Sequence, residues 1–243
     1  MRYKSILLFG APGTGKGTQG KILGTIPGFF HSSTGDIFRS LDLQSEAGRK
    51  FWEFSSRGEL VPAEFTIRVW RQYIQGMELI NQYHPETEFL VLDGIPRNLE
   101  QAKLLDETIE VVRIVHLQSD QKKMVERLRR RALKEGRADD ASDEVIGRRM
   151  EVYERETHPM LTFYPKRLIH EVDATLSQIR VLADIVAGLT PLKEALDVAA
   201  AERVEAIQSQ AYGQADVRSH GKQQGRPTGT PAAADAPEPA AVK

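Results

Sequence analysis

The chain has 243 residues, of which 40% are hydrophobic and 28% charged, so it can bury one good core with small insertions but not two large domains. Its formal net charge of -1 gives no overall attraction to nucleic acid or to an anionic membrane, so an anion site must come from local clusters of arginine and lysine. Because the chain has no cysteine, a disulfide framework, a thiolate metal site and a cysteine nucleophile are excluded.

The first apolar run, within residues 1–13, is too short for a signal peptide and ends in a glycine loop. No later run is long enough to span a bilayer. We therefore expect a cytoplasmic monomer that contacts neither membrane nor nucleic acid.

Apolar runs of strand length alternate with helical patterns along the chain. The runs SILLFG, FLVLDG and VVRIVHL predict buried strands at residues 5–10, 89–94 and 111–117, and GFFHSS and LIHEVD predict two more at 28–33 and 168–173. The patterns between them predict helices at residues 15–23, 63–80 and 142–161. This alternation predicts an α/β fold, in which a parallel β-sheet carries helices on both faces.

The composition changes after Leu189. Residues 191–214 are rich in alanine and prone to form a helix, whereas residues 215–243 have almost nothing to bury. We predict a core over residues 1–190 and a tail over residues 191–243 that is first helix-prone and then disordered. The first part of the tail could pack on the core or on a partner, but a solvated helix is the better interpretation.

A glycine-rich loop joins the first predicted strand to the first predicted helix. Its pattern Gly10-x-x-x-x-Gly15-Lys16 has the spacing of a phosphate loop, in which backbone N–H groups converge on an anion and the lysine reaches the outer phosphates of a nucleoside triphosphate. One position departs from the commonest form, since Gly17 stands where Ser or Thr usually binds Mg²⁺ and Thr18 comes one residue later. We predict that the triphosphate is bound by Gly13, Thr14, Gly15, Lys16, Gly17 and Thr18.

Asp93 ends the apolar run FLVLD, as expected for a strand beside the phosphate loop. Its carboxylate could act on Mg²⁺, directly or through water, or it could cap a helix or turn; taken alone, the two interpretations are equally supported. Arg97 follows four residues later, next to Pro96. In the usual sheet order its cation faces the same site as Lys16, so it can meet a second phosphorylated molecule.

Three separated motifs follow one another along the chain, GAPGTGKGTQG, SSTGDIFR and DGIPRNLEQA. The stretches RGELVP, RLRRRALKEGRADD and VYERETHPMLTFY extend the series. With these motifs the chain closely resembles the adenylate kinases, which are nucleoside monophosphate kinases, over about residues 1–190. The resemblance implies a P-loop NTPase-type fold with two moving parts, a small AMP-binding insertion at about 34–64 and a short lid at about 131–142. It also implies in-line transfer of the terminal phosphoryl of MgATP to AMP, giving two ADP.

The chemistry of this reaction calls for cations rather than for a general base. The second pKa of an AMP phosphate is about 6, so at pH 7 it is mostly a dianion and needs no base. Two highly charged phosphate groups must instead be brought together, which requires arginines around both. By the resemblance, Lys16 bridges the outer ATP phosphates and moves with the transferred group, and Arg39 and Arg97 bind the AMP phosphate.

The segment RLRRRALKEGR supplies further cations. By the resemblance, Arg127 stacks on the ATP adenine, while Arg131, Arg137 and one of Arg148 or Arg149 neutralise the transferring phosphoryl; we prefer Arg149, which keeps the spacing to Tyr153. Without the motifs, this basic run could equally be a solvated helix face. Asp139 and Asp140 look like an acidic pair that orients the arginines, although both could instead be carboxylates that favour a helix N-terminus.

The acceptor base is expected to be read by Thr34 and Gln101, which match adenylate kinases rather than pyrimidine kinases. A glutamine amide both donates and accepts, so it can pair with the N1 and N6 edge of adenine; Thr34 could alternatively be a helix cap. By the resemblance, Gly94 and the backbone around Glu59 and Val61 complete the AMP pocket, Ile95 replaces the usual phenylalanine of its wall, and the backbone around Thr175 and Leu176 contacts the ATP adenine.

The lid is short, and the chain lacks the four cysteines that often bind zinc there, so we expect no structural metal and only the Mg²⁺ that comes with ATP. Two alternatives stay open. One is a UMP/CMP or broad-specificity nucleoside monophosphate kinase. The other is a nonenzymatic nucleotide-dependent binding module that uses its tail to recruit a partner. The presence of an arginine at each expected catalytic position argues against this module.

Overall fold

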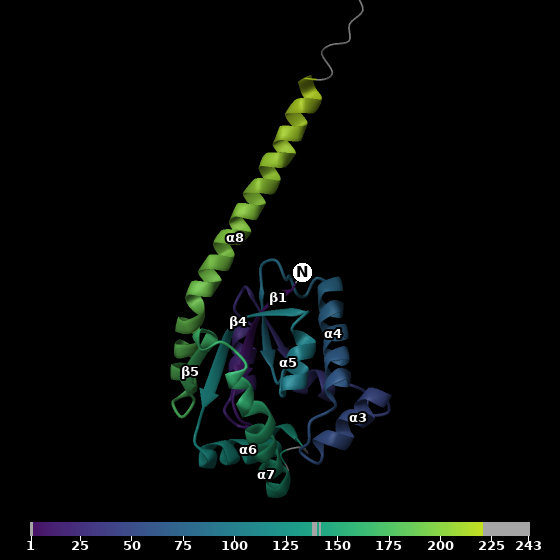
Figure 1. Ribbon diagram of the computed structural model, residues 1–243, viewed down its shortest axis with the longest axis vertical. Helices are drawn as coiled ribbons and strands as arrows, with labels where there is room; N and C mark the ends of the chain where they lie inside the picture. The colour runs from purple at the N-terminus through teal and green to yellow at the C-terminus, as the bar shows by residue number, and fades with distance from the viewer. Residues whose placement is uncertain (1, 138–139, 141, 221–243) are drawn as a thin grey trace, which may run out of the picture. The chain divides into compact units, whose positions relative to one another are not determined.

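The computed structural model describes residues 2–137, 140 and 142–220, and these form an α/β fold (Figure 1). The described strands are β1 (Tyr3–Phe9), β2 (Phe29–Ser33), β3 (Phe89–Asp93), β4 (Ile109–Gln118) and β5 (Ile169–Asp173). Within the described residues they make one five-stranded sheet in the order β2-β3-β1-β4-β5, with every neighbouring pair parallel. The predicted strands and the parallel sheet are thus confirmed, with boundaries that differ by no more than two residues.

The described α-helices differ in length, from six residues in α2 to 43 in α8. They are α1 (Lys16–Leu23), α2 (Thr34–Arg39), α3 (Glu46–Ser55), α4 (Ala63–Leu79), α5 (Leu99–Leu105), α6 (Gln121–Glu135), α7 (Asp143–Val152) and α8 (Gln178–His220). A π-helix, η2 (Tyr153–Thr157), and two 3-10 helices, η3 (His158–Thr162) and η4 (Lys166–Leu168), lie between α7 and β5.

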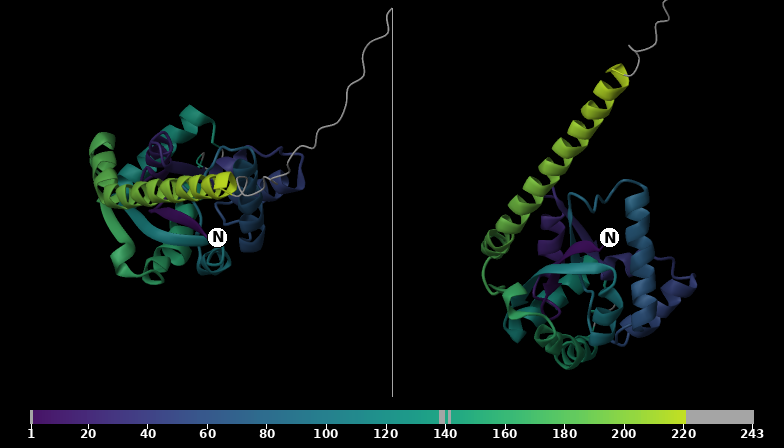
Figure 2. Two further views of the ribbon diagram at one scale, coloured as in Figure 1. Left: turned by 90° about the horizontal axis from the view of Figure 1, so that it is seen from above. Right: turned by 45° about the horizontal axis from the view of Figure 1, so that its top comes forward.

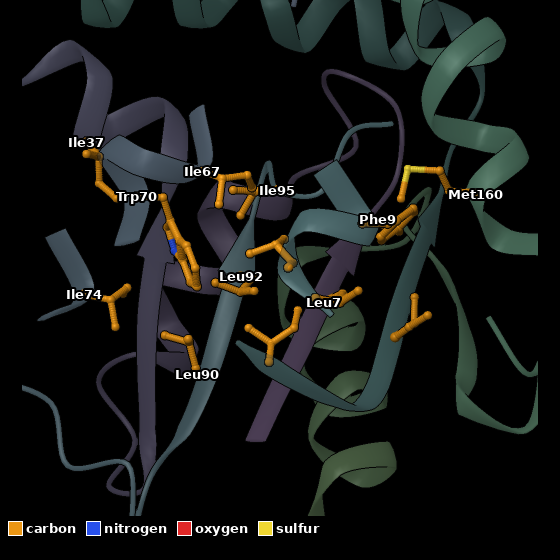
Figure 3. Packing of buried hydrophobic residues seen from close by; sticks show 14 of the residues in the cluster. Leu7, Phe9, Ile37, Ile67, Trp70, Ile74, Leu90, Leu92, Ile95 and Met160 are labelled. Atoms are coloured by element: carbon orange, nitrogen blue, oxygen red, sulfur yellow. The ribbon is translucent and has the colours of Figure 1, made fainter. Parts of the chain in front are cut away.

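Each face of the sheet is buried by its own set of helices. On one face, Trp70 and Ile74 of α4 pack with Leu7 and Leu92 of the strands (Figure 3). On the other face, α1 and the first part of α8 pack against the strands, and Figures 1 and 2 show α4 and the beginning of α8 on opposite sides of the sheet. Because both faces are covered, the central strands β1 and β3 carry continuous apolar runs, at residues 6–9 and 89–92, instead of alternating with polar residues.

The helix predicted at residues 142–161 is interrupted. The α-helical part ends at Val152, and the chain continues through the π-helix and then the 3-10 helix η3. Pro159 lies in the first turn of η3. Because proline has no backbone N–H, it cannot donate the hydrogen bond that would continue the α-helix from α7. The wider π-turn rotates the side chains that follow it, and such turns are common at functional sites.

The chain divides into two compact units, residues 1–198 and residues 199–243. Leu192 and Leu196 of α8 belong to the first unit, where they pack in the hydrophobic core between the sheet and the helices α1 and α8. The sequence analysis assigns both residues to the tail. In the second unit, residues 199–220 are helical. The helix therefore includes residues 215–220, for which the sequence predicts disorder. The rest of that predicted segment, residues 221–243, lies outside the described residues.

Among the residues that the structure describes, no helix combines the length and the apolar character that a membrane crossing requires.

Candidate active site

One cleft of about 490 Å³ opens at the carboxyl ends of β1 and β3, where loops of a parallel sheet converge. Its lining includes most residues that the sequence analysis assigns to ATP, AMP or catalysis: Gly13, Thr14, Gly15, Lys16, Gly17, Thr18, Thr34, Arg39, Glu59, Val61, Asp93, Gly94, Arg97, Gln101, Arg127, Arg131, Arg137, Arg149 and Leu176. Ile95 and Thr175, which the sequence analysis assigns to the pocket wall and to the adenine contact, are not among the lining residues.

The phosphate loop runs from the end of β1 to the start of α1 and depends on glycine at two tight positions. Gly10 has φ +142°, and a Cβ there would lie 2.5 Å from the carbonyl oxygen of Leu117. Gly13 has φ +89°, and a Cβ there would lie 2.5 Å from the carbonyl oxygen of Met124. Only glycine fits such positions, so the loop can curl with its N–H groups toward an anion.

Lys16 is held inside this loop. Its ammonium donates hydrogen bonds to the carbonyl oxygens of Gly10 at 2.6 Å and Ala11 at 3.1 Å. Burial is the main reason that the pKa of Lys16 falls from its ordinary value of 10.5 to about 8; Asp93 opposes the fall and three nearby arginines reinforce it. A phosphate in the loop would therefore find a partly desolvated cation already in position.

Asp93 lies at the end of β3, beside the first turn of α1. A Cβ on Gly17 would lie 3.4 Å from Asp93 Oδ2, and His31 Nε2 lies 3.9 Å from the same oxygen. Burial alone would raise the pKa of Asp93, but His31 and the cations of Lys16 and Arg97 outweigh it and hold the pKa below its ordinary value. A buried, ionised carboxylate next to a phosphate loop fits a Mg²⁺ ion bound through water, because Mg²⁺ prefers oxygen ligands and keeps much of its hydration.

Arg127 of α6 ties the phosphate loop to the segment that follows β5. Its guanidinium donates to the carbonyl oxygens of Thr14 at 3.3 Å and Ala174 at 3.0 Å. Leu176, half exposed two residues beyond Ala174, lines the same end of the cleft. This end offers a planar cation and an apolar side chain, which suit the faces of an aromatic base.

Arg97 and Gln101 line the part of the cleft that follows β3. Arg97 Nε donates to the carbonyl oxygen of Gly94 at 2.8 Å, and the Arg97 backbone N–H donates to Gln101 Oε1 at 2.7 Å. Gly94 has φ +82°, and a Cβ there would lie 2.9 Å from the Arg97 guanidinium. Gly94 is therefore needed both for its backbone conformation and for the room that Arg97 occupies.

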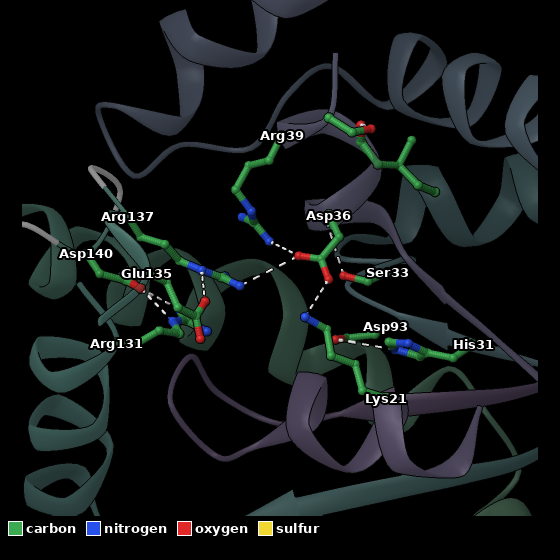
Figure 4. Close-up of polar contacts among 12 residues, drawn as sticks. Lys21, His31, Ser33, Asp36, Arg39, Asp93, Arg131, Glu135, Arg137 and Asp140 are labelled. Carbon is green, nitrogen blue, oxygen red and sulfur yellow. Dashed lines mark hydrogen bonds and ion pairs between the residues drawn. The ribbon is translucent and has the colours of Figure 1, made fainter. Parts of the chain in front are cut away.

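Three cations from different elements converge on Asp36, the third residue of α2 (Figure 4). Its carboxylate lies 2.6 Å from Arg39, 3.3 Å from Lys21 of α1 and 3.6 Å from Arg137, which follows α6. Burial opposes the charge, but the Arg39 and Lys21 cations outweigh it and lower the pKa of Asp36. Asp36 thus joins the two predicted moving parts of the molecule, residues 34–64 and residues 131–142.

Two arginines from different helices converge on Asp140, in the predicted lid. Its carboxylate is fully buried, accepts from Arg131 Nε at 2.7 Å and pairs with Arg149. Arg148 instead pairs with Glu151, and its side chain is 42% exposed. Arg149, and not Arg148, is thus among the residues that line the cleft, and Asp140 pairs with two arginines of the lining. Asp139, the other member of the predicted acidic pair, lies outside the described residues.

Sequence reasoning missed several side chains of the site, among them Asp36, Lys21, Glu135 and Thr157. Asp36 follows Thr34 in the motif STGD, and its acidic character in the first turn of α2 was a usable signal. Thr157 had no such signal, because its partner lies 60 residues away.

The described lining of the cleft holds ten lysines and arginines but only four carboxylates, despite the near-neutral chain. Such an excess is suited to several phosphate groups at once. A phosphate loop, a carboxylate beside it and arginines from facing elements define a P-loop enzyme that transfers a phosphoryl group between two phosphorylated molecules.

Comparisons with known proteins narrow this class. The sequence model of the family described as adenylate kinase matches residues 8–169. The adenylate kinase of Flavobacterium johnsoniae is 37% identical over 166 residues, covering 66% of this chain and 84% of that protein. Those of Thermobifida fusca and Flavobacterium psychrophilum are 38% and 33% identical, covering 70% and 76% of this chain and 89% and 99% of those proteins. The chain belongs to the adenylate kinase family.

Proposed function

We propose that this chain is an adenylate kinase, which reversibly transfers the terminal phosphoryl of MgATP to AMP and gives two ADP. One observation carries the proposal. The phosphate loop with Lys16 and the pair Arg97 and Gln101 line a single cleft, so a triphosphate and a second nucleotide can meet there without leaving the protein.

On the donor side, the loop residues 13–18 would bind the ATP phosphates through their N–H groups, with Lys16 on the outer phosphates. Arg127 and Leu176 would hold the adenine. Mg²⁺ would neutralise the phosphate oxygens, and Asp93 would hold it through water. The close approach of Asp93 to Gly17 supports this assignment.

On the acceptor side, Arg97 and Arg39 would bind the AMP phosphate. Gln101 would read the adenine edge, and Thr34, Gly94 and the backbone around Glu59 and Val61 would enclose the base and ribose. Thr34 Oγ1 is buried and has no hydrogen-bond partner among the described residues, which supports a role in contacting the acceptor.

The transfer step needs charge stabilisation more than acid or base chemistry, since the attacking AMP oxygen is already ionised. Arg131, Arg137 and Arg149 would surround the transferring phosphoryl. Asp140 pairs with Arg131 and Arg149 and so restrains their side chains, which means that less ordering is needed when phosphates bind. Closure of the lid would keep out water, which could otherwise take the phosphoryl group.

The proposal includes a cytoplasmic monomer without structural zinc that contacts neither nucleic acid nor membrane. ATP and AMP are cytoplasmic metabolites, and the absence of cysteine argues against a zinc site of the thiolate kind. A UMP/CMP kinase is the nearest alternative, and the match of Thr34 and Gln101 to the adenylate kinase pattern favours AMP over it.

A coupled assay of ADP formation, with MgATP and each of AMP, UMP, CMP and GMP, tests this function. We expect AMP to be the best acceptor and Arg97→Ala to lower kcat/KM for AMP at least about 100-fold, because a charge-assisted phosphate contact is lost. Arg155→Ala, at an exposed arginine paired with Glu156, is the matched control and should behave as the unaltered protein does. A preference for UMP or CMP would contradict the assignment of Thr34 and Gln101. Nucleotide binding without any transfer would favour the binding module.

A further inference from the structure

The backbone of Arg97 is held on both sides of its Cα, in two successive peptide units, by side chains from different elements. Its N–H donates to Gln101 Oε1 of α5 at 2.7 Å, and its C=O accepts from the Thr157 hydroxyl at 2.6 Å. Both residues are at least nine-tenths buried, with Gln101 2% and Thr157 9% exposed. Buried hydrogen bonds of this kind fix a backbone strongly, because no water replaces a lost partner.

Thr157 reaches this backbone from a distant part of the chain. It is the last residue of the π-helix that follows α7, and α7 carries Arg149. Thr157 also lines the cleft. Its hydroxyl therefore links the helix that presents an arginine to the transferring group with the loop that presents Arg97 to the acceptor.

The contact to Gln101 also fixes the orientation of an amide. A backbone N–H can be bonded only by the oxygen of a glutamine side chain, so Oε1 is turned toward Arg97 and the Nε2 group is turned the other way. Asn98 caps α5 and fixes the backbone of the same residue, since its side chain accepts from the Gln101 backbone N–H at 3.0 Å. The Arg97 N–H holds the side-chain amide against a flip that would exchange its oxygen and nitrogen.

An amide held this way reads one kind of base edge. Nε2 donates to a ring nitrogen that carries no proton, and the second lone pair of Oε1 accepts from an exocyclic amino group. Adenine and cytosine present that pattern. Hypoxanthine, guanine and uracil present the reverse, a protonated ring nitrogen beside a carbonyl, and would leave buried polar groups unpaired.

We propose that Thr157 is a positioning residue that sets both the phosphate contact and the base choice of the acceptor site by fixing the backbone of Arg97. This inference rests on the proposed function, because it assigns the acceptor nucleotide to this part of the cleft. Without the hydroxyl, the peptide unit that carries the Arg97 carbonyl loses this restraint and can rotate. The Arg97 Cα moves with it, which shifts the guanidinium and displaces the N–H that orients Gln101.

Thr157→Val keeps the shape of the side chain and removes the hydroxyl, and Thr157→Ser keeps the hydroxyl. Thr162→Val is the matched control, because the Thr162 hydroxyl also donates to a carbonyl, that of Pro159 at 2.7 Å, but lies exposed in the neighbouring η3 and does not line the cleft. AMP, IMP and ATP binding is measured by titration calorimetry, together with the melting temperature and the KM for AMP and for ATP. IMP differs from AMP only in its reversed base edge.

Thr157→Val should weaken AMP binding and raise the KM for AMP about tenfold, while the dissociation constant and the KM for ATP stay within about twofold. The ratio of AMP affinity to IMP affinity should fall about fivefold. Thr157→Ser and Thr162→Val should stay within about twofold of the unaltered protein. A lower melting temperature with unchanged AMP affinity and unchanged AMP-to-IMP preference would overturn the proposal, as would equal damage from valine and serine. If the unaltered protein binds AMP but transfers nothing to it, the proposed function fails while the binding data still decide on Thr157; if it does not bind AMP, both fail.

Discussion

At the scale of single residues, the burial of Lys16 makes ATP binding depend on pH. The pKa of about 8 in the free protein must rise when phosphates bind, since opposite charges favour the protonated amine. Above pH 8, binding therefore takes up a proton, and ATP affinity should fall by up to about tenfold per pH unit, while it stays nearly constant from pH 7 to 8.

Calorimetric titrations of ATP at pH 7, 8 and 9, in buffers of different ionisation enthalpy, measure both the affinity and the proton uptake. Lys16→Arg is the control, because arginine keeps its charge over this range and should remove the proton uptake even if binding is weaker. An affinity that does not change between pH 8 and 9 would contradict the low pKa of Lys16.

Gly94 offers a second test at this scale. Gly94→Ala should cost about 1–2 kcal/mol of stability, because φ is +82° and the new Cβ meets the Arg97 guanidinium, and it should raise the KM for AMP. Gly76→Ala is the control, since Gly76 lies within α4 with nothing near its Cβ, and should stabilise the protein by about 0.5–1 kcal/mol. Chemical denaturation measures the stability of both variants, and steady-state kinetics measures the KM for AMP. Equal stability changes in Gly94→Ala and Gly76→Ala would contradict the need for glycine at position 94.

The sequence predicts the residues of the cleft much better than it predicts their partners. Gly15 and Lys16 follow from a fixed local spacing, and Asp93 from the end of an apolar strand. The three cations around Asp36 and the bond from Thr157 to Arg97 join segments far apart in the chain. Such pairs depend on tertiary packing, which cannot be predicted from the spacing of residues in a single sequence.

At the scale of elements, Asp140 determines how the end of α6 and α7 present their arginines. Asp140→Asn should lower kcat by about tenfold to 100-fold and should change the KM for either nucleotide less than this. The reason is that Arg131 and Arg149 lose a shared buried carboxylate. Asp143→Asn is the control, since its pair with Arg129 is exposed, and should leave kcat unchanged. Steady-state kinetics that give the same kcat for both variants would contradict this role of Asp140.

Element boundaries were predictable where the hydrophobic period was strong. The strands around FLVLD and VVRIVHL and the helix α4 fall where the pattern puts them. The predicted helix at 142–161 was wrong as one element, because the π-turn that ends in Thr157 and the 3-10 turn at Pro159 do not alter the spacing of apolar residues.

At the scale of the whole molecule, the first compact unit reaches Val198. A chain that ends at residue 198 should therefore keep the stability and activity of the full chain. A chain that ends at residue 190 loses Leu192 and the buried Leu196 and should be less stable by about 3–5 kcal/mol. Thermal and chemical unfolding of both chains checks this, and equal stability would contradict the contribution of these leucines to the core.

The most direct test of the central claim follows the phosphoryl group itself. The protein is incubated with Mg²⁺, AMP and ATP labelled in the terminal phosphate, and the products are separated after a single turnover. Direct transfer in one cleft predicts that the label appears in the β-phosphate of the ADP made from AMP, with almost none in inorganic phosphate. Label released mainly as inorganic phosphate, whether or not AMP is present, would contradict the account.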